Sequence, residues 1–374
     1  MQVENFVSVL QDLGAGFYTG VPDSLLSPFT DYIMRTHGVS DCHIVAANEG
    51  AAVGLAAGHY LATGKPAVVY MQNSGIGNAT NPICSLLHEK VYALPVIFVI
   101  GWRGEPNVHD EPQHVFQGAV TLSQLECMEI PYAVISEETT DLKQCAADFK
   151  EHIQSGKSVA FVVRKGALKS SEKNKYSSPN SLSREEILVE IIANTTKNDV
   201  FVCTTGKLSR EVFEIRENNS MGHGQDFLTV GSMGHSLMLA YGIALAKPDK
   251  RVFCLDGDGA VLMHLGSLAV VGTSSVNNLV HIVINNGSHE TVGGIPTVAG
   301  DMDLSQVAAS LGYKNTFRVS TKSDLLAVLN KLDQLQGTVF VEVLSNLESR
   351  ADLGRPTTSP IENKNELMKF LGAI

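Results

Sequence analysis

The feature that most constrains the fold of this sequence is a regular alternation of short apolar runs with stretches of helical pattern. The runs have the length of strands and are rich in Val, Ile and Phe, which is typical of strands buried on both faces of a parallel sheet. They span residues 16–20, 43–47, 67–72, 95–101, 132–135 and 159–164, and then 200–204, 227–230, 251–256, 279–285, 315–319 and 338–344. We therefore predict an α/β fold with two doubly wound parallel sheets, each covered by helices on both faces.

One polar segment interrupts this alternation. Residues 166–184 are rich in Ser and Lys and contain Pro179, which is typical of a linker. We predict a first domain over residues 1–165, a linker over 166–184 and a second domain over 185–374, with no third domain between them. A chain of 374 residues is long enough for two such domains.

The composition narrows the classes of partner. The net charge is −11 and no block of Lys and Arg occurs, which argues against a nucleic-acid or membrane-surface partner. The six cysteines are scattered without a C-x-x-C pair, as in proteins of the reducing cytosol. The N-terminus lacks the basic and apolar regions of a signal peptide, and no apolar run approaches about 18 residues. We therefore expect a cytoplasmic protein with no nucleic-acid or membrane partner.

Polar residues follow two successive strands of the predicted second sheet. Gly257-Asp258-Gly259 follows the strand at 251–256, and Asn285-Asn286 ends the strand at 279–285. In a right-handed βαβ unit these two strand ends are neighbours, so Asp258 and Asn286 can share one hard cation such as Mg²⁺ or Ca²⁺. The two glycines let backbone N–H groups approach a diphosphate. The alternative is that Asp258 caps a helix and that Asn-Asn-Gly forms a turn.

This pair of motifs resembles the metal and diphosphate motif of thiamine-diphosphate enzymes. The resemblance implies that Mg²⁺ is held by Asp258, Asn286 and the main-chain oxygen of Ser288. A second stretch, "ANEGAAVGLAAG", follows the strand at 43–47 and resembles the glutamate motif of that family. It implies that Glu49 hydrogen-bonds N1′ of the cofactor's aminopyrimidine. The alternative for Glu49 is a first-turn residue that the helix dipole favours.

Two further stretches resemble parts of the cofactor site in this family. In "GSMGHSLMLAYGIALAKPDKR", Met233 would separate the two rings of the bent cofactor, and its alternative is an ordinary core residue. In "TTGKLSRE", the first turn of the second domain would add diphosphate contacts. The implied cofactor-binding residues are Glu49, Thr205, Gly206, Gly231, Ser232, Met233, Gly257, Asp258, Gly259, Ala260 and Asn286.

The absence of a middle domain departs from the pyruvate decarboxylase and acetolactate synthase pattern. It is similar to the compact phosphonopyruvate and sulfopyruvate decarboxylase group. Residues 100–118, "IGWRGEPNVHDEPQHVFQG", together with 20–29 and 285–297, resemble the phosphonopyruvate branch. The implied reaction is decarboxylation of 3-phosphonopyruvate to phosphonoacetaldehyde and CO₂ in phosphonate biosynthesis, with sulfopyruvate or another 2-oxo acid as the alternative substrate. The resemblance also implies a pyrimidine-binding first domain, a diphosphate-binding second domain, and a homodimer or dimer of dimers with sites at the subunit interface.

Several side chains on the predicted active-edge loops are candidates for proton transfer or substrate binding. A histidine that titrates near neutrality suits general acid catalysis, and Asp23 resembles a catalytic aspartate of larger decarboxylases. For each of them the alternative is a loop hydrogen bond, and for Arg103 it is a surface pair with Glu105. The catalytic candidates are Glu49, Asp23, His109, Asp110, His114 and His289, and the substrate candidates are Arg103, His114 and Asn73.

The sequence argues against two other classes of function. "GIGNAT" at 75–80 approaches a dinucleotide-binding turn, but no acidic residue ends a strand about 20 residues later, which argues against a nicotinamide-dependent oxidoreductase. A catalytically inactive cofactor-binding or assembly protein would not need Glu49, Asp258 and Asn286 together. We therefore expect a thiamine-diphosphate-dependent decarboxylase.

Overall fold

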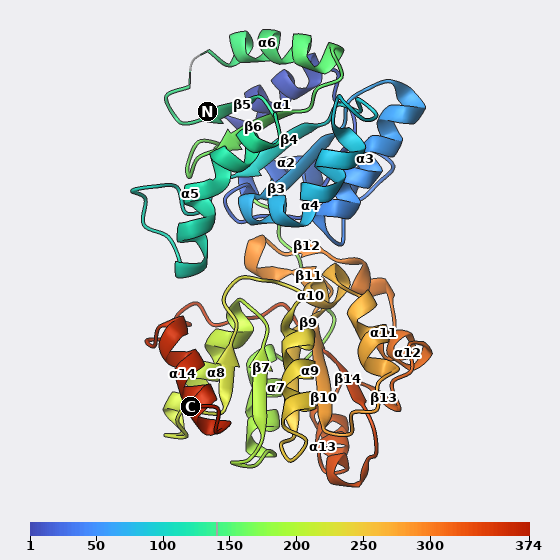
Figure 1. Cartoon of the computed structure of the whole chain (residues 1–374), viewed down its shortest axis with the longest axis vertical. Helices are drawn as coiled ribbons and strands as arrows, with labels where there is room; N and C mark the ends of the chain where they lie inside the picture. The colour runs from blue at the N-terminus through green and yellow to red at the C-terminus, as the bar shows by residue number, and fades with distance from the viewer. Residues whose placement is uncertain (140) are drawn as a thin grey trace. The chain divides into compact units, whose positions relative to one another are not determined.

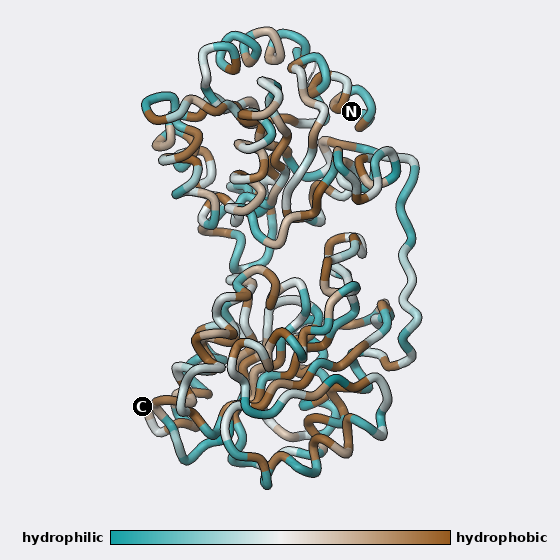
Figure 2. The backbone as a smooth tube through the Cα atoms, turned by 90° about the vertical axis from the view of Figure 1, so that its right-hand side faces the viewer, coloured by the Kyte–Doolittle hydropathy of each residue, from teal (hydrophilic) through white to brown (hydrophobic). Residues whose placement is uncertain are grey.

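The structure is a computed structural model that describes residues 1–139 and 141–374. It divides into two compact units, Met1–Lys175 and Tyr176–Ile374, and the division falls inside the polar segment 166–184 (Figure 1). Figure 2 shows that hydrophobic segments gather in the interior of each unit, while many of the connecting loops are hydrophilic. Among the described residues, every helix is too short or too polar to span a lipid bilayer.

The first unit is built on one parallel sheet with the strand order β2-β1-β3-β4-β6-β5. Its strands are β1 (Tyr18–Gly20), β2 (His43–Val45), β3 (Val68–Gln72), β4 (Ile97–Gly101), β5 (Tyr132–Ile135) and β6 (Val159–Val163). Alternate strand residues enter opposite cores because side chains alternate across a sheet. One core contains Val68 and Tyr70, and the other contains Val69 and Met71.

Helices cover both faces of this sheet. The helices α1 (Val3–Asp12), α2 (Ser27–His37) and α6 (Leu142–Gln154) pack into one core, and α3 (Glu49–Thr63), α4 (Ile76–Pro82) and α5 (Pro112–Cys127) pack into the other. The helix α3 contacts its neighbours mainly through alanines, which allow a close approach to the sheet.

The second unit repeats this architecture with the strand order β13-β14-β10-β9-β7-β8, again entirely parallel. Its strands are β7 (Val200–Cys203), β8 (Asp226–Leu228), β9 (Val252–Gly257), β10 (Leu279–Asn285), β13 (Asn315–Val319) and β14 (Val339–Leu344). The helices α7 (Arg184–Ala193), α8 (Lys207–Asn218) and α13 (Lys322–Leu329) share one core with the sheet. On the other face lie α9 (Ser236–Ala246), α11 (Gly266–Gly272) and α12 (Leu304–Ser310), while α14 (Pro360–Phe370) packs beside β8.

The predicted fold class is therefore confirmed, with each of the twelve apolar runs forming a strand of a parallel sheet. Two local features differ from the sequence analysis. The stretch 260–272 between two predicted strands does not form one helix: it is interrupted at His264, which has φ −134° and ψ 48°, so that α10 (Asp258–Met263) and α11 are separate helices. A short antiparallel pair, β11 (Ser288–His289) with β12 (Ile295–Pro296), was not predicted because two residues per strand leave no detectable period.

Candidate active site

Most of the predicted site residues lie at the carboxyl ends of strands, in one polar cluster per unit. In parallel α/β sheets this edge carries the loops that bind ligands. The first unit contributes Asp23 after β1, Glu49 after β2, Asn73 after β3, and Arg103, His109, Asp110 and His114 after β4. The second unit contributes Thr205 and Gly206 after β7, Gly231, Ser232 and Met233 after β8, Gly257 at the end of β9, Asp258, Gly259 and Ala260 after it, and Asn286, Ser288 and His289 after β10.

Asp258 lies at the centre of the second-unit cluster. The strands β9 and β10 pair so that Gly257 stands opposite Ile284, which places Asp258 beside the turn that follows β10. Its buried carboxylate accepts a hydrogen bond from Thr297 Oγ1 at 2.5 Å. Burial raises the pKa of Asp258 to about 6, against the opposing effect of the Thr297 hydroxyl and of backbone N–H groups that include that of Asn286. The structure thus brings Asp258 and Asn286 together, and within the described part of the chain only neutral groups donate to the carboxylate.

The turn after β10 is fixed by its own hydrogen bonds. Asn286 donates from Nδ2 to Glu290 Oε2 at 3.1 Å and accepts at Oδ1 from the Ser288 N–H at 3.0 Å. The Thr297 N–H donates to the Gly287 carbonyl at 2.9 Å, which closes the loop onto the β11–β12 pair. Asn286 Nδ2 donates to Glu290, and this contact fixes the orientation of the amide group. Oδ1 of Asn286 therefore points away from Glu290.

Glu290 joins this turn to two helix N-termini, and the sequence analysis did not predict it. Its carboxylate accepts from Arg184 Nη1 at 2.6 Å and from Lys207 Nζ at 2.8 Å. Arg184 also forms a bidentate pair with Glu211, with both distances 2.7 Å. Burial raises the pKa of Glu290, but Arg184 and Lys207 outweigh it, and the pKa ends below its usual range. Glu290 is therefore ionised and paired with two cations, whereas the groups of the described chain that donate to Asp258 are neutral.

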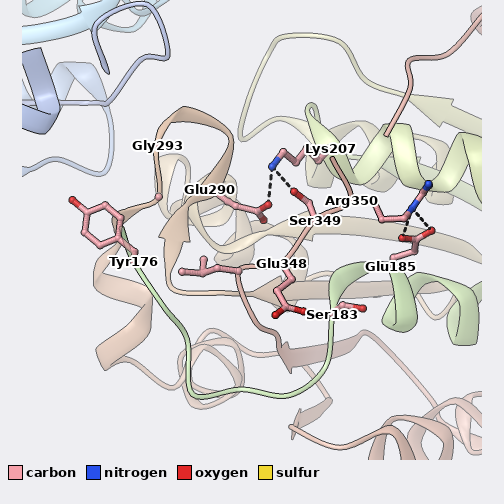
Figure 3. Close-up of a pocket in the computed structure, with 11 residues that line it drawn as sticks. Tyr176, Ser183, Glu185, Lys207, Glu290, Gly293, Glu348, Ser349 and Arg350 are labelled. Carbon is pink, nitrogen blue, oxygen red and sulfur yellow. Dashed lines mark hydrogen bonds and ion pairs between the residues drawn. The ribbon is translucent and has the colours of Figure 1, made fainter. Parts of the chain in front are cut away.

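A cavity of about 700 Å³ opens beside this network. Figure 3 shows Lys207 directed at Glu290 and Ser349 on one side, and Arg350 directed at Glu185. The lining residues are Tyr176, Ser183, Glu185, Lys207, Glu290, Gly293, Gly294, Leu347, Glu348, Ser349 and Arg350. The carboxylates of this lining (Glu185, Glu290 and Glu348) outnumber and neutralise its cations, Lys207 and Arg350. The cavity therefore does not favour an anion with two negative charges.

The turns after β7 and β8 meet at this edge. Thr205 Oγ1 accepts a hydrogen bond from the Gly231 N–H at 3.0 Å. Gly231 and Ser232 have φ values of 69° and 46°, in the left-handed region, and this conformation reverses the chain sharply before Met233. A Cβ atom on Gly259 would lie 2.9 Å from His289 Cε1 and 3.3 Å from Met233 Cε. These three residues therefore converge, and a side chain at position 259 would require His289 to shift.

In the first unit, Glu49 is the first residue of α3, and Asn48 caps this helix by accepting from the Ala51 N–H at 2.8 Å. The Glu49 carboxylate turns away from its own helix and accepts from Asn78 Nδ2 at 2.8 Å. A Cβ atom on Gly75 would lie 2.5 Å from Glu49 Cγ and Oε1. The position of the carboxylate thus depends on the absence of a side chain at Gly75.

Arg103 organises the loop after β4. It forms a bidentate pair with Asp110, with distances of 2.8 Å from Nε and 2.5 Å from Nη2, and donates from Nη1 to Ser24 Oγ at 3.1 Å. The surface pair with Glu105 that we considered does not form, because Glu105 pairs with Arg164 instead. The guanidinium of Arg103 is also close to the carboxyl of Asp23. Burial raises the pKa of Asp23 to about 6, and the positive charge of Arg103 opposes this rise.

The side chain of Asn73 holds this loop through hydrogen bonds to Arg103. Its buried amide donates to the Arg103 carbonyl and to Thr121 Oγ1, both at 2.8 Å, and accepts from the Arg103 N–H at 3.1 Å. All three contacts are internal, so the side chain of Asn73 holds Arg103 in place. Of the two loop histidines, His109 is exposed and His114 is buried.

His114 and His289 do not titrate near neutrality, as the general-acid hypothesis requires of a histidine donor. Burial, reinforced by Arg103, lowers the pKa of His114 to about 4, although Asp110 opposes the change. Burial alone lowers the pKa of His289 to about 4. Both imidazoles are therefore neutral at pH 7 and suited to hydrogen bonding.

The low pKa of His114 predicts an acid-sensitive contribution to stability. The unfolded chain binds this proton with a pKa of about 6.5 and the folded chain only at about 4, so stability is lost as the pH falls from about 6.5 through about 4. The loss is at most roughly 3 kcal/mol. His114→Gln should remove this part of the pH dependence of urea unfolding, while His109→Gln, at an exposed position of the loop before α5, should retain it. Identical profiles for wild type and His114→Gln would contradict the prediction. The difference between variants is needed because protonation of Asp23 acts in the opposite direction.

Comparison with known proteins shows what each unit of the chain is similar to. The family model "Thiamine pyrophosphate enzyme, N-terminal TPP binding domain" matches residues 3–126, and "Thiamine pyrophosphate enzyme, C-terminal TPP binding domain" matches residues 204–343. A phosphonopyruvate decarboxylase from Streptomyces viridochromogenes is 31% identical over 98% of this chain and 94% of its own length. One from Streptomyces hygroscopicus is 30% identical over 99% and 94%. A sulfopyruvate decarboxylase from Methanosarcina acetivorans is 25% identical over 78% and 79%.

Proposed function

The chain belongs to the family of thiamine pyrophosphate enzymes, and from this premise we propose that it is a carboxy-lyase that converts 3-phosphonopyruvate to phosphonoacetaldehyde and CO₂. The observation that carries the proposal is the near-full-length similarity to two phosphonopyruvate decarboxylases. We place the reaction in phosphonate biosynthesis. Sulfopyruvate is the second candidate substrate, supported by a relative that is less similar and matches less of the chain.

The second-unit cluster fits the cofactor and a magnesium ion. Thiamine diphosphate supplies the electron sink for the bond that breaks on loss of CO₂. We propose that Asp258, Asn286 and the main-chain oxygen of Ser288 hold Mg²⁺, which prefers oxygen ligands and retains phosphate oxygens in its shell. Residues 1–139 and 141–374 offer the buried Asp258 carboxylate only neutral donors, so a cation would satisfy it. The turns at Thr205-Gly206 and Gly231 would face the diphosphate.

Glu290 should act as a positioning residue for this magnesium site. Asp258→Ala should abolish Mg²⁺-dependent binding of thiamine diphosphate, measured by calorimetry. Arg184 and Lys207 hold the charged Glu290, which in turn orients Asn286. Glu290→Gln removes this charge and should weaken the Mg²⁺ affinity by about 10- to 100-fold. The control is Glu348→Gln, which changes an exposed carboxylate of the same cavity and should leave the affinity unchanged. An unaltered Mg²⁺ affinity in a folded Glu290→Gln protein would contradict the role of Glu290.

In the first unit, we propose that Glu49 hydrogen-bonds the pyrimidine N1′ of the cofactor and holds a proton there. The carboxylate is buried, it has one neutral donor in Asn78, and Gly75 leaves room beside it. A carboxylate in such a site can accept or share a proton with a ring nitrogen.

The role of Glu49 predicts matched effects of two different substitutions. Glu49→Gln should retain cofactor binding but slow the exchange of the cofactor C2 proton by orders of magnitude, since the amide cannot hold the N1′ proton. Gly75→Ala should produce a similar defect without touching Glu49, because its Cβ displaces the flexible carboxylate. Gly77→Ala, at an open position of the adjacent helix α4, should exchange normally. Exchange at the wild-type rate in Glu49→Gln would remove Glu49 from this role.

Proton delivery to the carbon that loses CO₂ requires a group that holds a proton near neutral pH. The pKa of about 6 places Asp23 closer to this range than His114 or His289, which are at about 4. Catalytic efficiency in proton transfer is greatest when the pKa lies near the working pH. We therefore propose Asp23 as the donor and the neutral His114 as a hydrogen-bonding group, with Arg103 supplying positive charge for the phosphonate.

Arg103 makes the substrate assignment testable. Wild-type protein should show the highest kcat/KM with phosphonopyruvate, followed by sulfopyruvate and then pyruvate. Arg103→Ala should lower kcat/KM for phosphonopyruvate by about 10- to 150-fold, the equivalent of one charged hydrogen bond, and affect pyruvate less. Arg164→Ala, which removes an arginine that is 45% exposed and paired with Glu105, is the control. A preference for sulfopyruvate would overturn the substrate assignment, and equal losses on all substrates would assign Arg103 to loop folding.

We further propose that the smallest active assembly is a homodimer. Related sulfopyruvate decarboxylases are named as alpha and beta subunits, and their matches cover 37% and 41% of this chain. In these relatives, polypeptides that resemble parts of this chain are named as subunits of one enzyme, which supports association in this family. Sedimentation equilibrium of the active protein tests the proposal, and an active monomer would contradict it.

A further inference from the structure

A buried group of Cys254, Asp256 and His281 lies on β9 and β10 in the second unit. Cys254 and Asp256 are two residues apart on β9 and therefore point to the same face of the sheet. His281 on β10 stands directly opposite Cys254. Their exposed fractions are 0%, 1% and 0%. One ligand-type atom from each residue lies within 4.8 Å of the other two.

The imidazole of His281 is oriented toward this group. Its Nδ1 lies 3.4 Å from the hydroxyl of Tyr313, and its ring packs edge-on against Phe340 with the centroids 5.1 Å apart. Among the described residues, Nε2 has no hydrogen-bond partner. The nearest carboxylate oxygen, Asp256 Oδ2, is 3.7 Å away, which is too far for a hydrogen bond. A buried polar atom without a partner is costly, so Nε2 requires something else to bind.

We propose that Cys254 Sγ, Asp256 Oδ2 and His281 Nε2 bind one Zn²⁺ ion that braces β9 against β10. Zinc bonds of about 2.0 to 2.3 Å at the tetrahedral angle separate two ligand atoms by roughly 3.3 to 3.6 Å. The 3.7 Å between Nε2 and Oδ2 therefore needs to close by only a few tenths of an ångström. A histidine ligand usually has its second ring nitrogen hydrogen-bonded, as Tyr313 provides here.

The donor set selects zinc over magnesium. A thiolate and an imidazole are poor ligands for Mg²⁺ but suit Zn²⁺, whose structural and catalytic sites use Cys, His and carboxylate groups. Three protein ligands leave a fourth position that a water molecule fills in such sites. The Asp256 Oδ1 atom is already occupied, since it accepts from the Gly257 N–H at 3.0 Å. Oδ2 is thus the atom available to the ion.

This zinc site would lie within the sheet, close to the proposed magnesium ligands along the chain. Asp256 precedes Asp258 by two residues, and His281 precedes Asn286 by five. An ion that links the two strands would fix their register where both chains leave the sheet. It is independent of the proposed decarboxylase activity, because none of its ligands is assigned to the cofactor or the substrate.

The test is the metal content and spectroscopy of the full-length protein produced with added zinc. We expect about one tightly held zinc per chain, and X-ray absorption should show one sulfur at about 2.3 Å with nitrogen or oxygen at about 2.0 to 2.1 Å. Replacement by Co²⁺ should give a thiolate-to-cobalt charge-transfer band. Cys254→Ser should lose both the metal and the band. Cys203→Ser, which changes an equally buried cysteine on β7 whose side chain lies in the opposite core, should keep them.

Two results would overturn the proposal. In the first, wild-type protein grown with added zinc contains none, and NMR shows that His281 Nε2 donates a hydrogen bond to Asp256. The other is bound zinc that Cys254→Ser retains or whose absorption spectrum contains no sulfur ligand. Should Cys254→Ser fail to fold, the wild-type spectrum alone decides between a sulfur-containing shell and none. Activity assays of the same preparations distinguish this outcome from a failure of the proposed decarboxylase function, since that function predicts no zinc.

Discussion

The parallel pairing of β9 with β10 is the constraint on which the second-unit site depends. With Ile284 opposite Gly257, both strands end at the same level of the sheet, and the Asn286 N–H reaches the Asp258 carboxylate. A slip of one residue would turn every side chain of a strand to the other face. It would separate Asp258 from Asn286 and bury the wrong residues in both cores. The apolar side chains of the two strands therefore fix the position of a polar site to which they make no chemical contribution.

The buried carboxylate of Asp258 and the partly buried carboxylate of Glu290 are stabilised in opposite ways, and this difference underlies the roles that we propose for them. Glu290 is surrounded by Arg184, Lys207 and the amide of Asn286, which together satisfy its charge. Asp258 has a hydroxyl and backbone N–H groups but no counter-charge among its hydrogen-bond partners, and its pKa is raised accordingly. A divalent cation would gain little from Glu290 and much from Asp258. Glu290 serves better as the fixed support that orients the amide oxygen of Asn286.

What could be predicted from the sequence depends on the range of the interaction. The strands follow from local apolar runs, and the neighbourhood of Asp258 and Asn286 follows from the handedness of one βαβ unit. Contacts that join distant segments gave no such signal: Glu290 lies 106 residues from Arg184, and Thr297 lies 39 residues from Asp258. The partner of Glu105 could not be predicted for the same reason. The sequence suggests the nearby Arg103, but the structure pairs Glu105 with Arg164, which follows β6. The lowered pKa values of the histidines depend on burial, which a loop sequence does not reveal.

The first-unit edge has an electrostatic arrangement that a doubly charged substrate would change. Arg103 lowers the pKa of both Asp23 and His114, although Asp23 remains raised because its burial dominates. If a phosphonate binds Arg103 as proposed, its negative charge offsets that of the guanidinium and adds repulsion toward the Asp23 carboxylate. Both effects favour the protonated form of each neighbour, so the pKa values of Asp23 and His114 rise when the substrate is present. Asp23 would then keep its proton at a higher pH until the carbon needs it. Pyruvate, which lacks the phosphonate, would leave Asp23 with its lower pKa and a smaller protonated fraction at neutral pH. The same group that identifies the substrate would in this way prepare the acid that completes the reaction.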